Sequence, residues 1–178
     1  VGVVRRGARG VLVEELPAIE GLARVDVVGI DKTGTLTEGS MTVGSLVPLA
    51  GGTEASCTKS GAAEALGALA HADERPNASM RALAEEFAAP VAWRATDRVP
   101  FSSARKWSGV TFFGGETWVL GAPEVLAPVD EQVKQIVAEF AADGARTVLI
   151  SATSTPIDRD GLPRGLAPMG LVVLADQV

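Results

Sequence analysis

Cysteine, histidine and aromatic residues are scarce in this sequence: among 178 residues there are one cysteine (Cys57), one histidine (His71) and no tyrosine. One cysteine excludes a disulfide framework and a metal cage built from the thiolates of this chain. No apolar run approaches the roughly 20 residues that cross a bilayer. Arginines at positions 5, 6 and 9 also interrupt the first residues. We therefore expect neither a transmembrane helix nor a signal peptide.

Positive charge is limited too, since 16 Lys and Arg face 22 Asp and Glu and the formal net charge is −6. Nucleic-acid affinity depends on clustered basic side chains, and no run of like charge is present, so we expect no nucleic-acid partner. Hydrophobic residues make up 47% of the chain, which is enough to bury a core. The sequence predicts a soluble, cytosol-compatible polypeptide with one domain or two closely associated lobes.

Hydrophobic periodicity and capping residues predict the secondary structure. Helices are expected over 61–71 and 78–88, the second after an Asn77 cap, and a third between an Asp130 cap and a left-handed Gly144. Strands are expected over 25–30, 42–49, 91–99, 107–113, 117–120, 147–152 and 170–174, with Gly114 and Gly115 closing a two-residue hairpin. This order predicts an α+β lobe inserted between two pieces of an α/β unit.

The sharpest chemical signal is the heptapeptide DKTGTLT, which begins at Asp31 directly after the first expected strand. An unbroken β-branched run is typical of a strand buried on both faces, and ligands bind at the carboxyl ends of such strands. There the Asp31 carboxylate can act as a nucleophile that accepts a phosphoryl group. Lys32 adds positive charge, and Gly34 lets backbone amides approach phosphate oxygens. Thr33 and Thr35 supply hydroxyl donors. The alternative is an Asx-type turn with a routine helix cap.

This heptapeptide resembles the phosphorylation signature of the P-type ATPases, within the haloacid-dehalogenase-like superfamily. The resemblance covers nearly the whole chain in order and spacing. It extends to LVEELPAIE from residue 12, FSSARKWS from 101, GAPE from 121, DGARTV from 143 and GLVVLAD from 170. In the family, similar segments precede the phosphorylation site, line the nucleotide-binding domain and return toward the phosphorylation domain.

The resemblance implies a fold and an activity. The fold would be an α+β nucleotide-binding domain, an antiparallel sheet flanked by helices, inserted into a partial haloacid-dehalogenase-like α/β unit. A partial phosphorylation domain would occupy 1–40, the nucleotide-binding domain 41–174, and a return toward the phosphorylation domain 175–178. The parent enzyme would couple ATP hydrolysis, through an aspartyl-phosphate, to cation transport.

The same resemblance implies partners and a location. The partners would be ATP and the rest of the same polypeptide: membrane helices, the remaining phosphorylation domain and an actuator domain. The chain would be the cytoplasmic portion of a plasma-membrane protein. The family's T-G-D-G-x-N-D loop, which helps to hold magnesium, does not occur in this sequence. Because phosphoryl transfer depends on positioning and charge neutralisation, we expect this chain alone to bind nucleotide without turnover.

Carried over residue by residue, the catalytic group would be Asp31, Lys32, Thr33 and Thr35. Asp31 would attack the γ-phosphate of ATP, and Mg²⁺ would be held by Asp31 and the carbonyl of Thr33. Soluble relatives generally have a second aspartate two positions after the nucleophile, as general acid and base. Thr33 cannot transfer protons in that way, so a long-lived phosphoenzyme that drives a conformational change is expected.

The implied ATP-binding group is Phe101, Lys106, Gly121 and Arg146. Phe101 would stack on adenine, Lys106 would lie near the nucleotide, and Arg146 would reach the phosphates, contacts that suit ATP. The alternatives are core packing for Phe101, a solvated basic pair for Lys106 and Arg105, and a surface ion pair for Arg146.

The chain departs from the family pattern at several positions. Leu120 replaces a lysine beside the nucleotide, Ser103 replaces a basic residue found in some relatives, and Met80 stands where many relatives have an acidic residue near adenine. His71 is followed by Ala72 rather than by the proline of soft-metal transporters. By analogy, a hard cation such as calcium is the expected cargo. Two other functions stay open: a soluble phosphatase of the same superfamily, or a non-catalytic nucleotide-sensing or interaction module.

Overall fold

The computed structural model describes residues 24–27, 41–49, 59–158 and 161–176. The chain divides into two units, Val1–Leu36 and Thr37–Val178. Of the strand expected over 25–30, the described residues 25–27 are exposed and form no strand, so the prediction is wrong for that part. An apolar run becomes a buried strand only when neighbouring strands satisfy its backbone groups.

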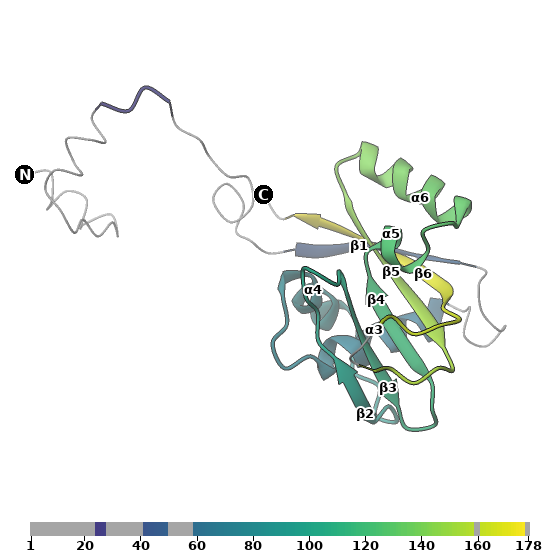
Figure 1. The fold of residues 1–178 in the computed structure, drawn as a ribbon. Helices are drawn as coiled ribbons and strands as arrows, with labels where there is room; N and C mark the ends of the chain where they lie inside the picture. Colours follow the sequence, from purple (N-terminus) through teal and green to yellow (C-terminus); the bar gives the residue numbers. More distant parts are fainter. Residues whose placement is uncertain (1–23, 28–40, 50–58, 159–160, 177–178) are drawn as a thin grey trace, which may run out of the picture. The chain divides into compact units, whose positions relative to one another are not determined.

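A six-stranded antiparallel sheet organises the described part of the second unit (Figure 1). Its strands are β1 (Met41–Pro48), β2 (Ala95–Val99), β3 (Trp107–Phe112), β4 (Thr117–Gly121), β5 (Arg146–Thr153) and β6 (Ala167–Asp176). They lie in the order β1-β6-β5-β4-β3-β2. Strands β2 to β6 therefore follow one another across the sheet. β1, the first strand in the sequence, pairs with β6, the last. Met41 lies opposite Asp176 in that pair.

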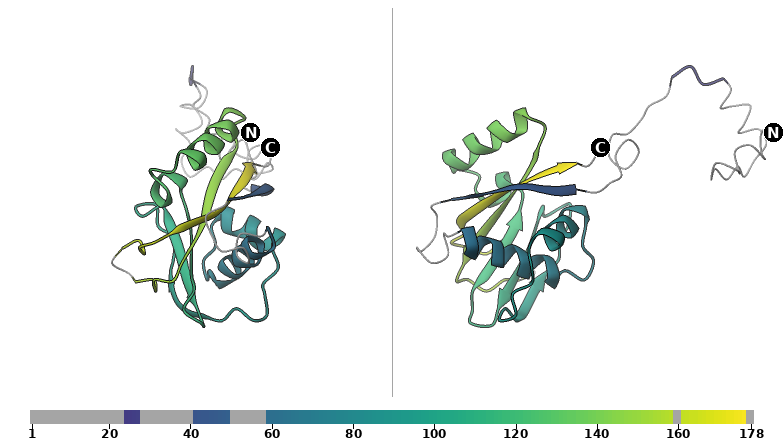
Figure 2. Two further views of the ribbon diagram at one scale, coloured as in Figure 1. Left: turned by 90° about the vertical axis from the view of Figure 1, so that its right-hand side faces the viewer. Right: turned by 180° about the vertical axis from the view of Figure 1, so that it is seen from behind.

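Helices cover both faces of this sheet (Figure 2). α3 (Lys59–Ala72) and α4 (Ala78–Glu86) pack on one face, and α5 (Pro123–Leu126) and α6 (Glu131–Ala142) pack on the other. The buried side chains of β4 alternate between the two layers. Trp118 and Leu120 join the core under α3 and α4, while Val119 joins the core under α5 and α6. This alternation is the period of two that a strand between two layers requires. None of the described helices is long and apolar enough to cross a membrane.

The predicted α+β class, an antiparallel sheet flanked by helices, is confirmed. Both predicted N-caps are confirmed as well. The side-chain oxygen of Asn77 accepts a hydrogen bond from the backbone of Met80 at 2.9 Å, and Asp130 accepts one from Val133 at 3.0 Å. Gly144 has a φ of 75°, as expected for the left-handed residue after a helix.

Two predictions near the β2–β4 strands are wrong. β2 begins at Ala95, because residues 91–92 form a turn in which Val91 is fully exposed. The turn between β3 and β4 contains three residues, 113–115, because the backbone N–H of Phe112 donates to the carbonyl of Glu116 at 2.9 Å. The two glycines of this turn do have positive φ values, 112° and 86°.

Gly67 in α3 provides a test of how closely the helical layer packs. A Cβ at this position would collide with the backbone carbonyl of Ala88, just after α4. Overpacking costs about 1–3 kcal/mol, more than the ~1 kcal/mol that alanine gains over glycine in a helix. We expect Gly67→Ala to lower the free energy of unfolding, measured by urea denaturation. The matched control is Gly161→Ala, whose Cβ would meet nothing within 4 Å. Equal stabilities for the two variants would contradict the close approach of α3 to Ala88.

Candidate functional site

A groove of about 690 Å³ lies where β4 ends and β5 begins. This volume is within the usual range of small-ligand sites. Its walls come from the N-terminus of α4, the loop over 100–106, the start of α5 and the first residues of β5. The lining residues considered below are Met80, Phe101, Lys106, Ser108, Leu120, Gly121, Glu124 and Arg146. The four residues that the sequence assigns to ATP binding therefore line one groove, although they come from separate elements.

Phe101 is an aromatic side chain that is not used for core packing. It is 42% exposed and belongs to neither core cluster, which argues against the core-packing alternative. The groove beside it is apolar, because Met80 and Leu120 are both buried and line it. Ser108 is buried as well and adds a hydroxyl group to the wall that Met80 and Leu120 form. The groove thus offers an aromatic ring and an apolar surface at one part of its wall.

Arg105 ties the loop that carries Phe101. Its guanidinium donates to the carbonyl of Pro100 at 2.8 Å and lies 5.8 Å from the ring centroid of Trp107. The backbone N–H of Arg105 donates to the Ser102 hydroxyl at 3.2 Å. These contacts differ from the solvated basic pair that was the alternative for Arg105. Sequence reasoning missed this role, because it depends on a carbonyl and a ring that only the folded loop brings together.

Lys106 has an unusual backbone conformation, with a φ of 60°. Its N–H donates to the carbonyl of Ser102 at 2.8 Å, and its own carbonyl accepts from Ala122 at 2.9 Å. The Lys106 ammonium lies 3.2 Å from a carboxylate oxygen of Glu124, and both side chains are more than half exposed. A hydrogen bond from its own backbone N–H has the largest effect and lowers the pKa of Glu124. Burial acts in the opposite direction, and the hydrogen bond and charge of Lys106 lower the pKa further. Glu124 is therefore an anion within the groove.

Gly121 has a packing reason to lack a side chain. A Cβ there would lie 2.7 Å from both the Lys106 carbonyl oxygen and the Cβ of Trp107, its partner across β3 and β4. Only a residue without Cβ permits this approach of the two strands. Gly121 consequently contributes backbone alone to the groove.

Arg146 is the first residue of β5, paired with Leu174 in the sheet, and its side chain is exposed. Within the described ranges it forms no ion pair. Its guanidinium is a second cation on the groove wall, with Lys106.

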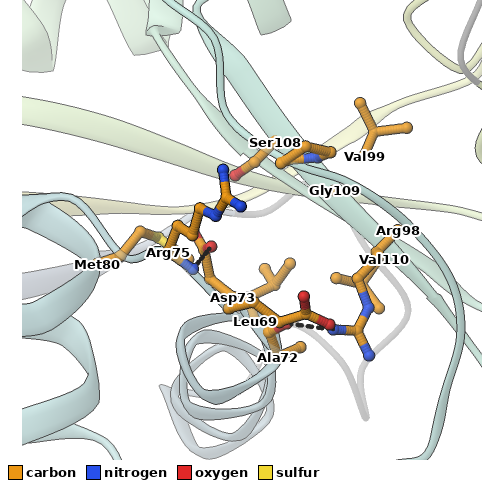
Figure 3. A pocket seen from close by; sticks show the side chains of 12 residues that line it. Leu69, Ala72, Asp73, Arg75, Met80, Arg98, Val99, Ser108, Gly109 and Val110 are labelled. Carbon is orange, nitrogen blue, oxygen red and sulfur yellow. Dashed lines mark hydrogen bonds and ion pairs between the residues drawn. The ribbon is translucent and has the colours of Figure 1, made fainter.

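A smaller cavity of about 280 Å³ adjoins the groove and shares Met80 and Ser108 with it (Figure 3). Glu74, an acidic residue just after α3, lines this cavity. Its carboxylate is 2.9 Å from the Arg98 guanidinium, which also donates to the carbonyl of Ala72. Glu74 is therefore paired within this neighbouring cavity and does not line the groove. The groove therefore has no contribution from the Glu74 carboxylate where Met80 lines it.

The predicted catalytic and metal-binding residues, Asp31, Lys32, Thr33 and Thr35, lie outside the described residues. Within the part of the chain that is described, no group of three or more His, Cys, Asp or Glu could hold a metal ion. The described geometry therefore concerns the groove alone.

No family model matches the chain. Curated relatives do match it from end to end. The calcium-transporting ATPase CtpE of Mycobacterium tuberculosis is 48% identical over 178 residues, and that of Mycolicibacterium smegmatis is 46% identical. The probable cation-transporting ATPase exp7 of Streptococcus pneumoniae is 32% identical over 99% of the chain. The chain spans 22% of the length of each of these relatives.

A solved structure shares the fold. A zinc-transporting PIB-type ATPase in its E2.Pi state aligns with a TM-score of 0.57 and 22% sequence identity. The alignment covers 99% of this chain and 26% of that protein.

The Glu124 carboxyl allows a test of the groove's electrostatics. Its pKa is lowered in the folded chain, so its pairing with Lys106 persists at neutral pH and is lost as the pH falls through that lowered value. We expect Lys106→Met to raise the Glu124 pKa toward the ordinary glutamate value, measured by NMR titration of the side-chain carboxyl carbon. Lys134→Met, on α6, removes another lysine and should leave the Glu124 titration where it is. An unchanged midpoint in Lys106→Met would refute the contact.

Proposed function

Because this chain belongs to the P-type ATPase family, we propose that it contains the ATP-binding part of a cation-transporting ATPase and the segment with the phosphorylated aspartate. The observation that carries the proposal is the convergence of one exposed aromatic ring and two cations on a single groove. Phe101, Lys106 and Arg146 come from separate segments, and all three line it. Aromatic stacking and cationic contacts are the interactions that a purine nucleotide needs.

In this proposal the base occupies the apolar part of the groove. Adenine stacks on Phe101, next to the buried side chains of Met80 and Leu120. The phosphates extend toward Lys106 and Arg146. Since Leu120 supplies no charge, and Lys106 is paired with Glu124, most of the affinity comes from the base. Binding is consequently expected to depend little on the number of phosphates.

Asp31 is the proposed acceptor of the γ-phosphate, with Lys32, Thr33 and Thr35 around it. Asp31 and the Thr33 carbonyl are proposed to hold Mg²⁺, which would neutralise phosphate charge. The aspartyl-phosphate would form as the bond between the β- and γ-phosphates breaks and ADP leaves. Its slow hydrolysis would then couple to ion movement in other parts of a longer polypeptide, including membrane helices and an actuator domain.

Several observations support this wider assignment. The adjacent ends of β1 and β6 suit a lobe inserted into another domain, and the curated relatives are several times longer than this chain. A cytoplasmic location follows from the proposed access to ATP. The names of the mycobacterial relatives favour calcium as the transported ion.

Phe101→Ala tests the base contact. We expect the 178-residue chain to bind adenosine, AMP, ADP and ATP with little preference for the triphosphate, measured by isothermal titration calorimetry. Loss of stacking, worth about 1–3 kcal/mol, should weaken each ligand by about fivefold to 150-fold in Phe101→Ala. The matched control is Phe113→Ala in the β3–β4 turn, an exposed ring outside the groove. Absence of nucleotide binding by the unaltered chain would favour a non-nucleotide role and defeat the proposal.

Asp31→Asn tests the phosphoryl acceptor in the full-length protein that contains this chain. Incubation with ATP labelled at the γ-phosphate, followed by acid quenching, should leave a hydroxylamine-labile label on the unaltered protein. Asp31→Asn should carry none, because an amide is not a nucleophile for this transfer. Asp97→Asn on β2 should label normally. A label that persists in Asp31→Asn would assign the acceptor to another residue.

A further inference from the structure

We propose that Glu124 competes with nucleotide phosphate for Lys106, and so limits how strongly the groove distinguishes nucleotides by their number of phosphates. This inference rests on the proposed function and deepens it. Before a nucleotide binds, the Glu124 carboxylate is paired with the Lys106 ammonium. Lys106 must leave this carboxylate before it can pair with a phosphate group. Glu124 is then a specificity-determining residue, although it touches no adenine.

The first support is the strained backbone of Lys106. A side chain at positive φ strains the backbone, and such strain persists only where surrounding contacts hold it. Here the Ser102 carbonyl and the Ala122 N–H bond to the two sides of the residue. The Lys106 backbone is therefore held in one conformation, which fixes the point from which its side chain leaves the loop. From that point the ammonium reaches Glu124 at the start of α5.

The second support is the exchangeable character of the pair. Lys106 and Glu124 are 3.2 Å apart, and both remain more than half exposed. Exposed pairs of this kind contribute little to stability, so a phosphate group can displace the carboxylate without disturbing the fold. The charge-assisted bond to a phosphate is also stronger than a solvated carboxylate contact.

The third support is the balance of charge in the groove. Lys106, Arg146 and Glu124 line it together, and Lys106 is neutralised by its partner. Of the two cations that line the groove, Arg146 is the one without an ion pair to a described residue. The lowered pKa of Glu124 keeps its carboxylate charged at neutral pH. A nucleotide therefore gains less from its second and third phosphates than the two cations alone would provide.

The test is to titrate Glu124→Gln with adenosine, AMP, ADP and ATP, using the 178-residue chain and calorimetry. Release of Lys106 should tighten ADP and ATP about twofold to fivefold and change adenosine by much less. The control is Glu131→Gln, which breaks the 2.7 Å pair with Lys134 on α6 and makes the same change in net charge. It should leave all four affinities unchanged. Unaltered ATP affinity in Glu124→Gln would overturn the inference.

A double-variant cycle separates competition for Lys106 from simple repulsion between Glu124 and phosphate. If Glu124 acts through Lys106, Glu124→Gln should have almost no effect on ATP affinity in a Lys106→Met background. An equal gain in both backgrounds would show repulsion alone and overturn the proposal. Glu124→Asp, with a shorter side chain and unchanged charge, should behave like Glu124→Gln if contact with Lys106 is what matters. If the unaltered chain binds ATP while these variants show no difference, only this inference fails. If the unaltered chain binds none of the four ligands, the proposed function is wrong and this inference fails with it.

Discussion

The contact between Trp107 and Gly121 is the constraint on which the groove depends. Strands β3 and β4 approach so closely there that a Cβ on Gly121 would lie 2.7 Å from neighbouring atoms on both Trp107 and Lys106. Directly beyond this pair, the Lys106 carbonyl accepts the N–H of Ala122. One close packing contact thus fixes the end of the Phe101 loop relative to the start of α5. Backbone hydrogen bonds thus hold the two walls of the groove, whereas its charged side chains are exposed and can change partners.

This division between fixed backbone and exchangeable side chains has an energetic basis. The cores on either side of β4 are buried and insensitive to solvent, and their rearrangement would cost several kcal/mol. The ion pair of Lys106 with Glu124 is exposed and contributes about 1 kcal/mol at most. Arg105 is a side chain that helps to fix the shape of the groove, because its contacts with Pro100 and Trp107 hold the loop in place. A ligand can therefore alter the charges in the groove while the shape of the groove persists.

The sequence was a good guide where structure depends on nearby residues. α6 needs only its apolar spacing and the Asp130 cap, and both are local. Prediction failed where the result depends on distant partners: Val91 lies in a turn, and residues 25–27 form no strand. For the groove, short motifs were enough to select Phe101 and Lys106. The motif GAPE contained Glu124, yet its partner could not be read from spacing, because Lys106 comes 18 residues earlier and only the fold brings the two side chains together.

The pairing of Met41 with Asp176 has an architectural consequence. Antiparallel neighbours are about 5 Å apart, so the chain leaves the sheet one strand spacing from where it enters. A lobe with such ends can be replaced by a relative's lobe, or by a short turn. Neither change would alter the distance between the points where the chain enters and leaves the sheet. Changes within the groove therefore need not alter the spacing between these two strand ends.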